Sequence, residues 1–146
     1  MAAIKEKPSL TIVRKLKAAP EKVWRALTQP EALKLWMAPS DEFRIPFAEA
    51  DLRVGGRFHV VMNSPDGETH DVSGIYREIV PDRKLVYTWA WKSTPERESL
   101  VTWELRAVGG GTELTLKHEQ FFDEEARDRH QQGWPGCLAR LEKFVA

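Results

Sequence analysis

FFDEEARDRHQQGWPGCLARLEKFVA, residues 121–146, is the stretch that decides the fold. At 100° per residue, one set of mainly apolar side chains falls on an arc of roughly 120°, the width of the buried face of a helix. The set comprises Ala126, His130, Trp134, Cys137, Leu138, Leu141, Phe144 and Val145. Arg127 is the one charged residue inside this arc. The pattern predicts a long C-terminal helix that needs an apolar surface beneath it.

A proline lies in the middle of the predicted helix. Pro135 has no N–H to donate to the carbonyl of Gln131, and its ring crowds that carbonyl. We therefore expect a kink that divides the helix into two segments. Trp134 would lie at this kink, on the side that faces the rest of the domain.

Most of the chain before this helix has the two-residue period of β-strands. Apolar and polar side chains alternate in the stretches 9–17, 43–47, 57–63, 69–80, 85–92, 101–106 and 114–119. Pro46 places the second stretch at a sheet edge, because proline cannot donate to a neighbouring strand. In the last three stretches one face is aromatic and aliphatic and the other carries threonine and charge. This contrast is typical of an antiparallel sheet covered on one side only.

Two short helices are predicted after the first strand, because Pro20 with Glu21 and then Pro30 are good first-turn residues. The order of strand, two short helices, about six further strands and a long helix predicts the α+β class, with the helices on one face of the sheet. No linker or repeat divides the chain. We therefore expect one domain spanning residues 1–146, with residues 1–8 as a frayed tail.

Composition excludes several classes of protein. Lys plus Arg number 22 and Asp plus Glu number 22, so the net charge is zero and a general nucleic-acid binder is not expected. No apolar run reaches the roughly 18 residues of a membrane span, and residues 1–10 lack the core of a signal peptide. The single cysteine excludes an intramolecular disulfide framework, so a cytoplasmic location is expected. Six tryptophans point to a bulky core or an aromatic-lined pocket.

Several motifs, taken in order, resemble a known family. They are Ala19–Trp24 with Leu27, Pro30 and Trp36; Asp51–Phe58; Gly74–Ile79 with Pro81; Leu85–Trp89; Gly110–Leu116 with His118; and Gly133, Trp134, Leu138 and Leu141. The chain resembles the heat-shock-protein-90 ATPase activator homologue (Aha-type) family of the START/SRPBCC, polyketide cyclase-like superfamily. That resemblance implies the helix-grip fold, a curved antiparallel sheet of about six to seven strands wrapped around the long C-terminal helix.

The resemblance also implies a deep cavity between sheet and helix, which the superfamily uses for hydrophobic ligands. Its members include polyketide cyclases, aromatases, lipid carriers, hormone receptors and co-chaperone domains, so the fold alone does not determine the function. The eukaryotic co-chaperone joins this domain to a separate N-terminal domain, for which we expect no room in 146 residues. Chaperone contact is therefore expected to lack the support of that domain.

Aromatic side chains are the first candidates for a ligand site. Tyr87, Trp89, Trp91 and Trp103 share the sheet face that must meet the C-terminal helix. They are either the wall of a pocket for a flat apolar ligand or simply core. His118 has the same parity as the apolar residues of its strand, so its imidazole should point inward. There it could orient a ligand or act as an acid or base, or else only hydrogen-bond the backbone.

Four further residues complete the expected ligand-binding set: Met62, Tyr76, His130 and Trp134. The direction of Tyr76 depends on whether Gly74 forms a bulge, which would reverse the side of every residue after it. Either Tyr76 and Glu78 or the isoleucines 75 and 79 then face inward.

No motif indicates a metal or a cofactor. His118, His130 and Cys137 fit no zinc spacing, and no Gly-x-Ser-x-Gly elbow occurs. The glycines 109–111 lead into a strand rather than a helix, so they form no phosphate loop. No catalytic constellation is visible, and an enzyme is the less favoured interpretation.

The leading hypothesis is binding of a small hydrophobic or aromatic molecule between sheet and helix. One alternative is a cyclase- or dehydratase-type enzyme that uses His118 as its acid or base. Another is a protein-interaction module that regulates a chaperone, which would need an exposed apolar or charge-complementary patch. The sequence gives no indication of the oligomeric state.

Overall fold

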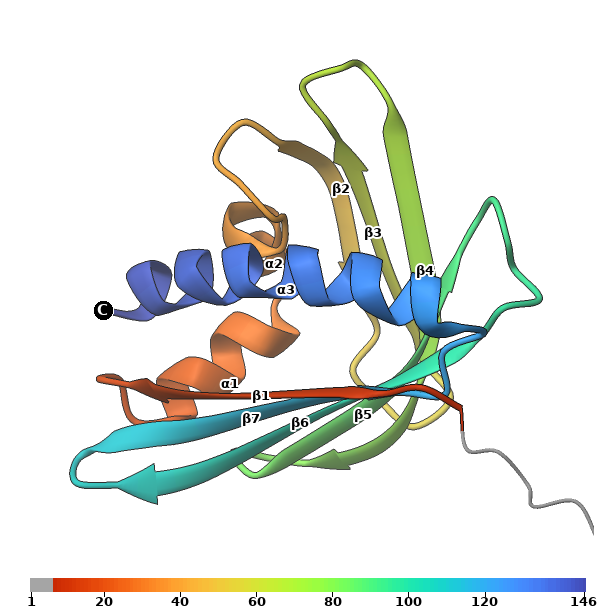
Figure 1. The fold of residues 1–146 in the computed structure, drawn as a ribbon. Coiled ribbons are helices and arrows are strands. Elements are labelled where there is room, and N and C mark those ends of the chain that lie inside the picture. Colours follow the sequence, from red (N-terminus) through yellow and green to blue (C-terminus); the bar gives the residue numbers. More distant parts are fainter. Residues whose placement is uncertain (1–6) are drawn as a thin grey trace, which may run out of the picture.

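The computed structural model of the protein describes residues 7–146, and Figure 1 shows its arrangement. Its elements are β1 (Leu10–Leu16), α1 (Pro20–Thr28), α2 (Pro30–Trp36), β2 (Arg44–Ala50), β3 (Arg57–Asn63), β4 (Thr69–Val80), β5 (Lys84–Trp91), β6 (Ser99–Val108), β7 (Gly111–Glu119) and α3 (Glu124–Val145). The α+β class and the two short helices after the first strand are confirmed. The predicted frayed tail falls largely outside the described residues, but the carbonyl of Pro8 accepts a hydrogen bond from the Phe121 N–H.

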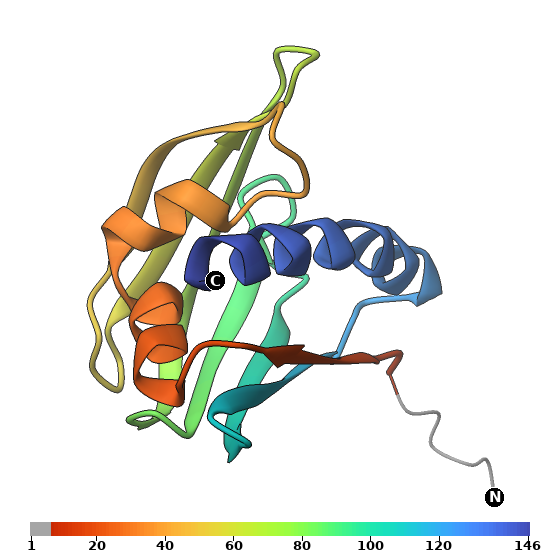
Figure 2. The ribbon, with the colours of Figure 1, turned by 90° about the vertical axis from the view of Figure 1, so that its left-hand side faces the viewer.

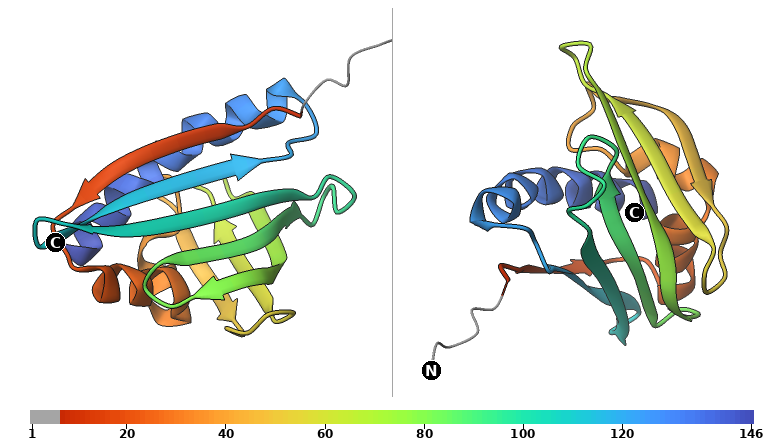
Figure 3. Two further views of the ribbon diagram at one scale, coloured as in Figure 1. Left: turned by 90° about the horizontal axis from the view of Figure 1, so that it is seen from below. Right: turned by 90° about the vertical axis from the view of Figure 1, so that its right-hand side faces the viewer.

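All seven strands form one antiparallel sheet in the order β1-β7-β6-β5-β4-β3-β2. The view from below in Figure 3 shows β1 beside β7, at the opposite edge from β2. Pro46 lies in the edge strand β2, as predicted, within a register shift between Arg44 and Phe47. The sheet curls around α3, so that β2, β3 and β4 rise behind the helix while β1 and β7 run below it (Figure 1). This is the expected helix-grip fold.

Gly74 marks a close approach of β4 to the backbone of β5. A Cβ atom at this position would lie 1.7 Å from the carbonyl oxygen of Thr88, so only glycine fits. Beside it, the Ile75 N–H donates to the Thr88 hydroxyl at 2.8 Å instead of to a backbone carbonyl. Gly74 is therefore needed for close backbone approach rather than for a bulge.

The bulge itself lies further along β4, between Tyr76 and Glu78, where the register with β5 shifts. Tyr76 precedes the shift and is fully buried, whereas Ile79 follows it and packs against the core. Glu78 is exposed. The side chains of Tyr76 and Ile79 thus both face inward, an arrangement that neither predicted alternative contained.

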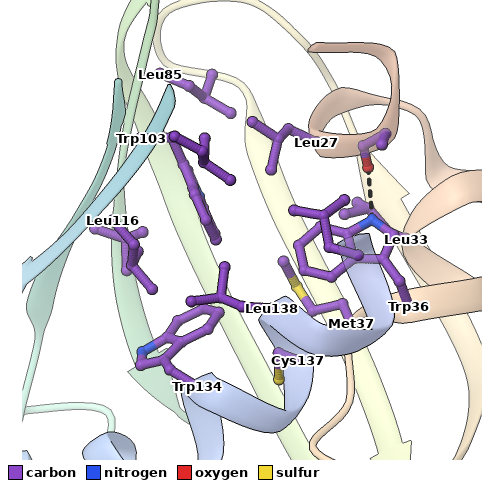
Figure 4. Close-up of a cluster of buried hydrophobic side chains, with 14 of the residues drawn as sticks. Leu27, Leu33, Trp36, Met37, Leu85, Trp103, Leu116, Trp134, Cys137 and Leu138 are labelled. Carbon is purple, nitrogen blue, oxygen red and sulfur yellow. Dashed lines mark hydrogen bonds between the residues drawn. The ribbon is translucent and has the colours of Figure 1, made fainter. Parts of the chain in front are cut away.

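The core fills the space between the concave face of the sheet and the three helices. Its central side chains are drawn in Figure 4, where Trp103 of β6 and Leu85 of β5 face Leu27 and Trp36 of α1 and α2. Trp36 is fully buried, and its indole N–H donates to the Ala26 carbonyl at 2.8 Å. This bond satisfies the one polar atom of a large apolar side chain, so the tryptophan can be buried without an unpaired donor.

The long helix α3 differs in one respect from its prediction. It runs unbroken from Glu124 to Val145, with Pro135 inside it, so the expected division into two segments is wrong. Gln131, whose carbonyl lacks its usual donor because of Pro135, is an exposed residue. The buried stripe agrees with the predicted arc, except that Phe144 is 40% exposed.

The C-terminal half of α3 is held against α1 and α2 (Figure 2). Arg140 donates to the Leu35 carbonyl at 3.1 Å and to the carbonyl of Trp36 at 3.4 Å, and its Nε lies 3.1 Å from Oδ1 of Asp41. These contacts satisfy carbonyls that the end of α2 leaves without intrahelical partners.

Two glycines of α3 are expected to respond in opposite ways to substitution by alanine. A Cβ at Gly136 would lie 2.0 Å from the Pro39 carbonyl oxygen, whereas a Cβ at Gly133 meets nothing within 4 Å. Gly133→Ala should raise the free energy of unfolding by about 0.5–1 kcal/mol through its helix propensity. Gly136→Ala should lower it by about 1–2 kcal/mol, because the clash outweighs that gain. Urea unfolding of both variants measures the difference, and equal effects would contradict the close packing at Gly136.

Candidate functional site

A cleft of about 960 Å³ lies between the N-terminal half of α3 and the ends of β3, β4 and β5. Its apolar lining includes Met37, Phe43, Met62, Trp89, Trp91, Phe121, Phe122, Ala126, Trp134 and Cys137. The rest of the lining is mainly polar and charged and comes from the start of β4, the loop after β5 and α3. A cleft of this size can hold one small organic molecule.

The sequence-predicted site residues divide into two groups. Met62, Trp89, Trp91, His130 and Trp134 line the cleft. Tyr76, Tyr87, Trp103 and His118 also point inward but are buried in the core and do not line it. These four side chains therefore lie in the core and not in the wall of the cleft.

Both nitrogens of His118 are engaged in a chain of hydrogen bonds. The Trp134 indole N–H donates to Nδ1 at 3.0 Å, so Nδ1 must act as an acceptor. Nε2 therefore carries the proton and donates to the Ser99 hydroxyl at 2.7 Å, which donates in turn to the Trp89 carbonyl at 3.2 Å. The chain accounts for every polar atom of a neutral, fully buried imidazole.

His130 makes a complementary set of contacts from α3. Its Nδ1 donates to the Ala126 carbonyl at 2.7 Å, so its Nε2 is left as an acceptor. The indole N–H groups of Trp89 and Trp91 both donate to this Nε2, at 3.2 and 3.1 Å. The ring centres of His118 and His130 are 4.9 Å apart, and Phe121 packs against both rings.

The surroundings of the two histidines favour their neutral forms. Burial lowers the pKa of His118 well below its ordinary value, and the neighbouring His130 lowers it further. Burial also lowers the pKa of His130; the hydrogen bond to the Ala126 carbonyl opposes this shift in part, and Arg129 adds a smaller contribution that lowers the pKa. Indole groups can only donate, so they oppose a proton on the nitrogens that they face. This geometry leaves His118 no free atom for acid–base chemistry in the cleft.

Burial also keeps Cys137 and Tyr87 in their protonated forms. Burial raises the pKa of Cys137 to about 12, so its sulfur stays a thiol rather than a nucleophilic thiolate. The Tyr87 hydroxyl accepts from the Trp103 indole at 3.0 Å, and burial raises the pKa of Tyr87. The hydroxyl of Tyr76 has no hydrogen-bond partner among residues 7–146. Within the same residues, no group of three potential metal ligands comes together.

The sequence interpretation missed the residues at the mouth of the cleft. Lys92 and Arg97 belong to the loop after β5, Phe122 precedes α3, and Arg129 lies in the second turn of α3. The guanidinium carbon of Arg97 lies 4.0 Å from the centre of the Phe122 ring, in a cation–π contact. Loops have no hydrophobic period that could point to these residues. The only signal in the sequence is that charged and aromatic residues are frequent in the segments before β6 and after β7.

Comparison with known proteins assigns the family. Residues 17–146 match the family described as "Activator of Hsp90 ATPase homolog 1-like protein". The chain belongs to this family. Similar members include the human "Activator of 90 kDa heat shock protein ATPase homolog 1", which is 31% identical over 127 residues, or 86% of this chain and 33% of that protein. The chain thus spans about a third of the length of this relative.

Solved structures of other proteins share this fold. A Chromobacterium violaceum protein is 28% identical with a TM-score of 0.85, and the match covers 94% of this chain and 96% of that one. The AHSA1 protein of Silicibacter pomeroyi is 26% identical with a TM-score of 0.83, and the match covers 93% of this chain and 96% of that one.

Among residues 7–146, no helix has both the length and the apolar composition to cross a bilayer.

The neutral histidines predict that stability falls in weak acid. The folded protein keeps His118 and His130 unprotonated, whereas the unfolded chain binds protons below the ordinary histidine pKa of about 6.5. Their contribution to stability is therefore present above that pH and is lost as the pH falls below it. Between about pH 7.5 and 5.5 the free energy of unfolding should drop, by at most about 2–3 kcal/mol, the limit for two imidazoles that stay unprotonated in the folded protein, and urea unfolding measures it.

The His118→Gln variant serves as the control for this pH dependence. It removes His118, the more strongly shifted of the two groups, so its stability should depend less steeply on pH, whatever its absolute stability. A free energy of unfolding that stays constant or rises on acidification would contradict the neutral network.

Proposed function

We propose that this protein binds a small hydrophobic or aromatic molecule in the cleft between α3 and the sheet. The observation that carries the proposal is the aromatic wall of a cleft of about 960 Å³. Trp89 and Trp91 of β5 form one side, and Phe121 and Trp134 approach from the other. Edge-to-face and tilted contacts hold these rings, with 5.5 Å between the centres of Trp89 and Trp91 and 5.2 Å between those of Trp89 and Trp134.

The hydrogen bonds inside this wall support an apolar ligand. All three indole N–H groups of Trp89, Trp91 and Trp134 donate to imidazole nitrogens. A buried donor without a partner would weaken binding. A ligand that covers these rings leaves no such donor, because each indole N–H already has its acceptor. The wall needs no polar group from the ligand, and it favours a flat apolar body.

Two earlier alternatives differ in their support. An enzyme using His118 would need this side chain in contact with its substrate, and the burial and hydrogen bonds of His118 do not favour it.

Contact with a 90 kDa heat-shock protein is a second candidate function, favoured by the 31% identity to the human activator homologue. Stimulation of that chaperone's ATPase rate by this chain would support it, and an unchanged rate would count against it. A cytoplasmic location stays a prediction from the single cysteine.

Filling the cleft from Gly133 tests the binding proposal. Gly133 lines the cleft, and a side chain added there has open space before it. The neutral fluorescent probe N-phenyl-1-naphthylamine should bind the natural protein saturably, with energy transfer from the tryptophans of the wall. Gly133→Phe should weaken this binding about tenfold or more, because its ring occupies the ligand volume.

Gly133→Ala is the matched control, because it changes the same backbone position but adds a single methyl group. It should bind the probe with a dissociation constant within about twofold of the natural protein, consistent with a methyl group's small share of the cleft. Absence of saturable binding to the natural protein, or equal binding by both variants, would contradict the proposal.

A further inference from the structure

The mouth of the cleft carries an excess of positive charge. Three cationic residues line it, Lys92, Arg97 and Arg129, against one carboxylate, Asp71. The whole chain has a net charge of zero, so this excess is local. It lies at the end of an aromatic wall that needs no polar contact itself.

Four carboxylates, one in the lining and three near these cations in sequence, are already engaged or lie outside the cleft. Asp71 contacts Nε2 of His59 at 2.8 Å. Glu125 pairs with Arg129 one turn away on α3. Glu96 and Glu98 belong to the same loop as Arg97, but they do not line the cleft. The positive charge of Lys92 and Arg97 is therefore not neutralised from within the lining.

Lys92 and Arg97 have free donors. Within residues 7–146, neither side chain forms an ion pair or a hydrogen bond with another residue. Arg97 is nevertheless positioned, because its guanidinium packs on the ring of Phe122, itself 55% exposed at the rim. Stacking uses the face of the guanidinium and leaves its N–H edge available for an anion.

We infer that the ligand of this cleft is an amphipathic organic anion. Its aromatic or aliphatic body lies against Trp89 and Trp91, and its carboxylate, sulfonate or phosphate group meets Lys92 and Arg97 at the mouth. This inference rests on the proposed binding function and adds the chemical class of the ligand. A wholly apolar ligand would leave this pair of cations at the rim without a role.

Two fluorescent probes with the same body isolate the charge. 8-Anilino-1-naphthalenesulfonate differs from N-phenyl-1-naphthylamine only by its sulfonate group. The Lys92→Gln/Arg97→Gln double variant should weaken sulfonate binding about fivefold or more, the sum of two partly exposed ion contacts. Its affinity for the neutral probe should change less than about twofold, because the apolar wall is untouched. Added salt should weaken only the sulfonate, and only in the natural protein.

A control variant separates this effect from the loss of net charge. Lys22→Gln/Arg77→Gln removes two exposed cations that do not line the cleft. It should leave the affinities for both probes unchanged. Equal weakening by the two double variants would show a long-range charge effect and would overturn the assignment of the anion to Lys92 and Arg97.

Competition with ten-carbon ligands identifies the head group. Decanoate or decyl phosphate should displace the neutral probe at lower concentration than decanol, and the better of the two anions names the group preferred. Displacement by decanol at the same concentration as both anions would overturn the inference, as would unchanged sulfonate binding in Lys92→Gln/Arg97→Gln. Failure of the neutral probe to bind the natural protein would instead refute the binding function itself, whereas failure of the sulfonate alone would overturn only the inference.

Discussion

The structure depends on three indole N–H groups that point at two imidazole rings. An indole can donate but not accept, so each histidine nitrogen that it meets must stay unprotonated. Trp134 imposes this on His118 from the helix, and Trp89 with Trp91 imposes it on His130 from the sheet. The bonds cross between α3 and the strands in both directions. They therefore fix how far along the sheet the helix lies, which apolar packing alone specifies less sharply.

The other half of α3 is fixed by its contacts with backbone carbonyls of α2 and of the segment after it. Gly136 allows the helix to approach the Pro39 carbonyl, and Arg140 reaches the carbonyls at the end of α2. One helix is thus attached at two places by different means. The cleft lies along the half that the indole–imidazole network holds, where α1 and α2 do not cover the sheet (Figure 2).

Much of the fold was predictable because the two-residue and 3.6-residue periods survive in the final structure. The inward direction of Trp89 and His118 follows directly from strand parity. The hydrogen-bond partners of His118 could not be predicted in this way, because they belong to β6 and α3 and come together only in the folded chain. The bulge after Tyr76 has no local signal, and α3 continues through Pro135, where the sequence predicts a break. Lys92 and Arg97 were missed because loop residues follow no period.

This arrangement separates the parts of the protein that hold it together from the parts that meet a ligand's polar end. The hydrogen-bond network belongs to strands and to α3, whereas the charged rim belongs largely to the loop between β5 and β6. That loop is joined to the rest by few backbone bonds, such as Lys92 N–H to the Asp71 carbonyl at 2.8 Å. Members of a family that kept the network could exchange this loop and acquire different ligands, with the same folded frame carrying each new specificity.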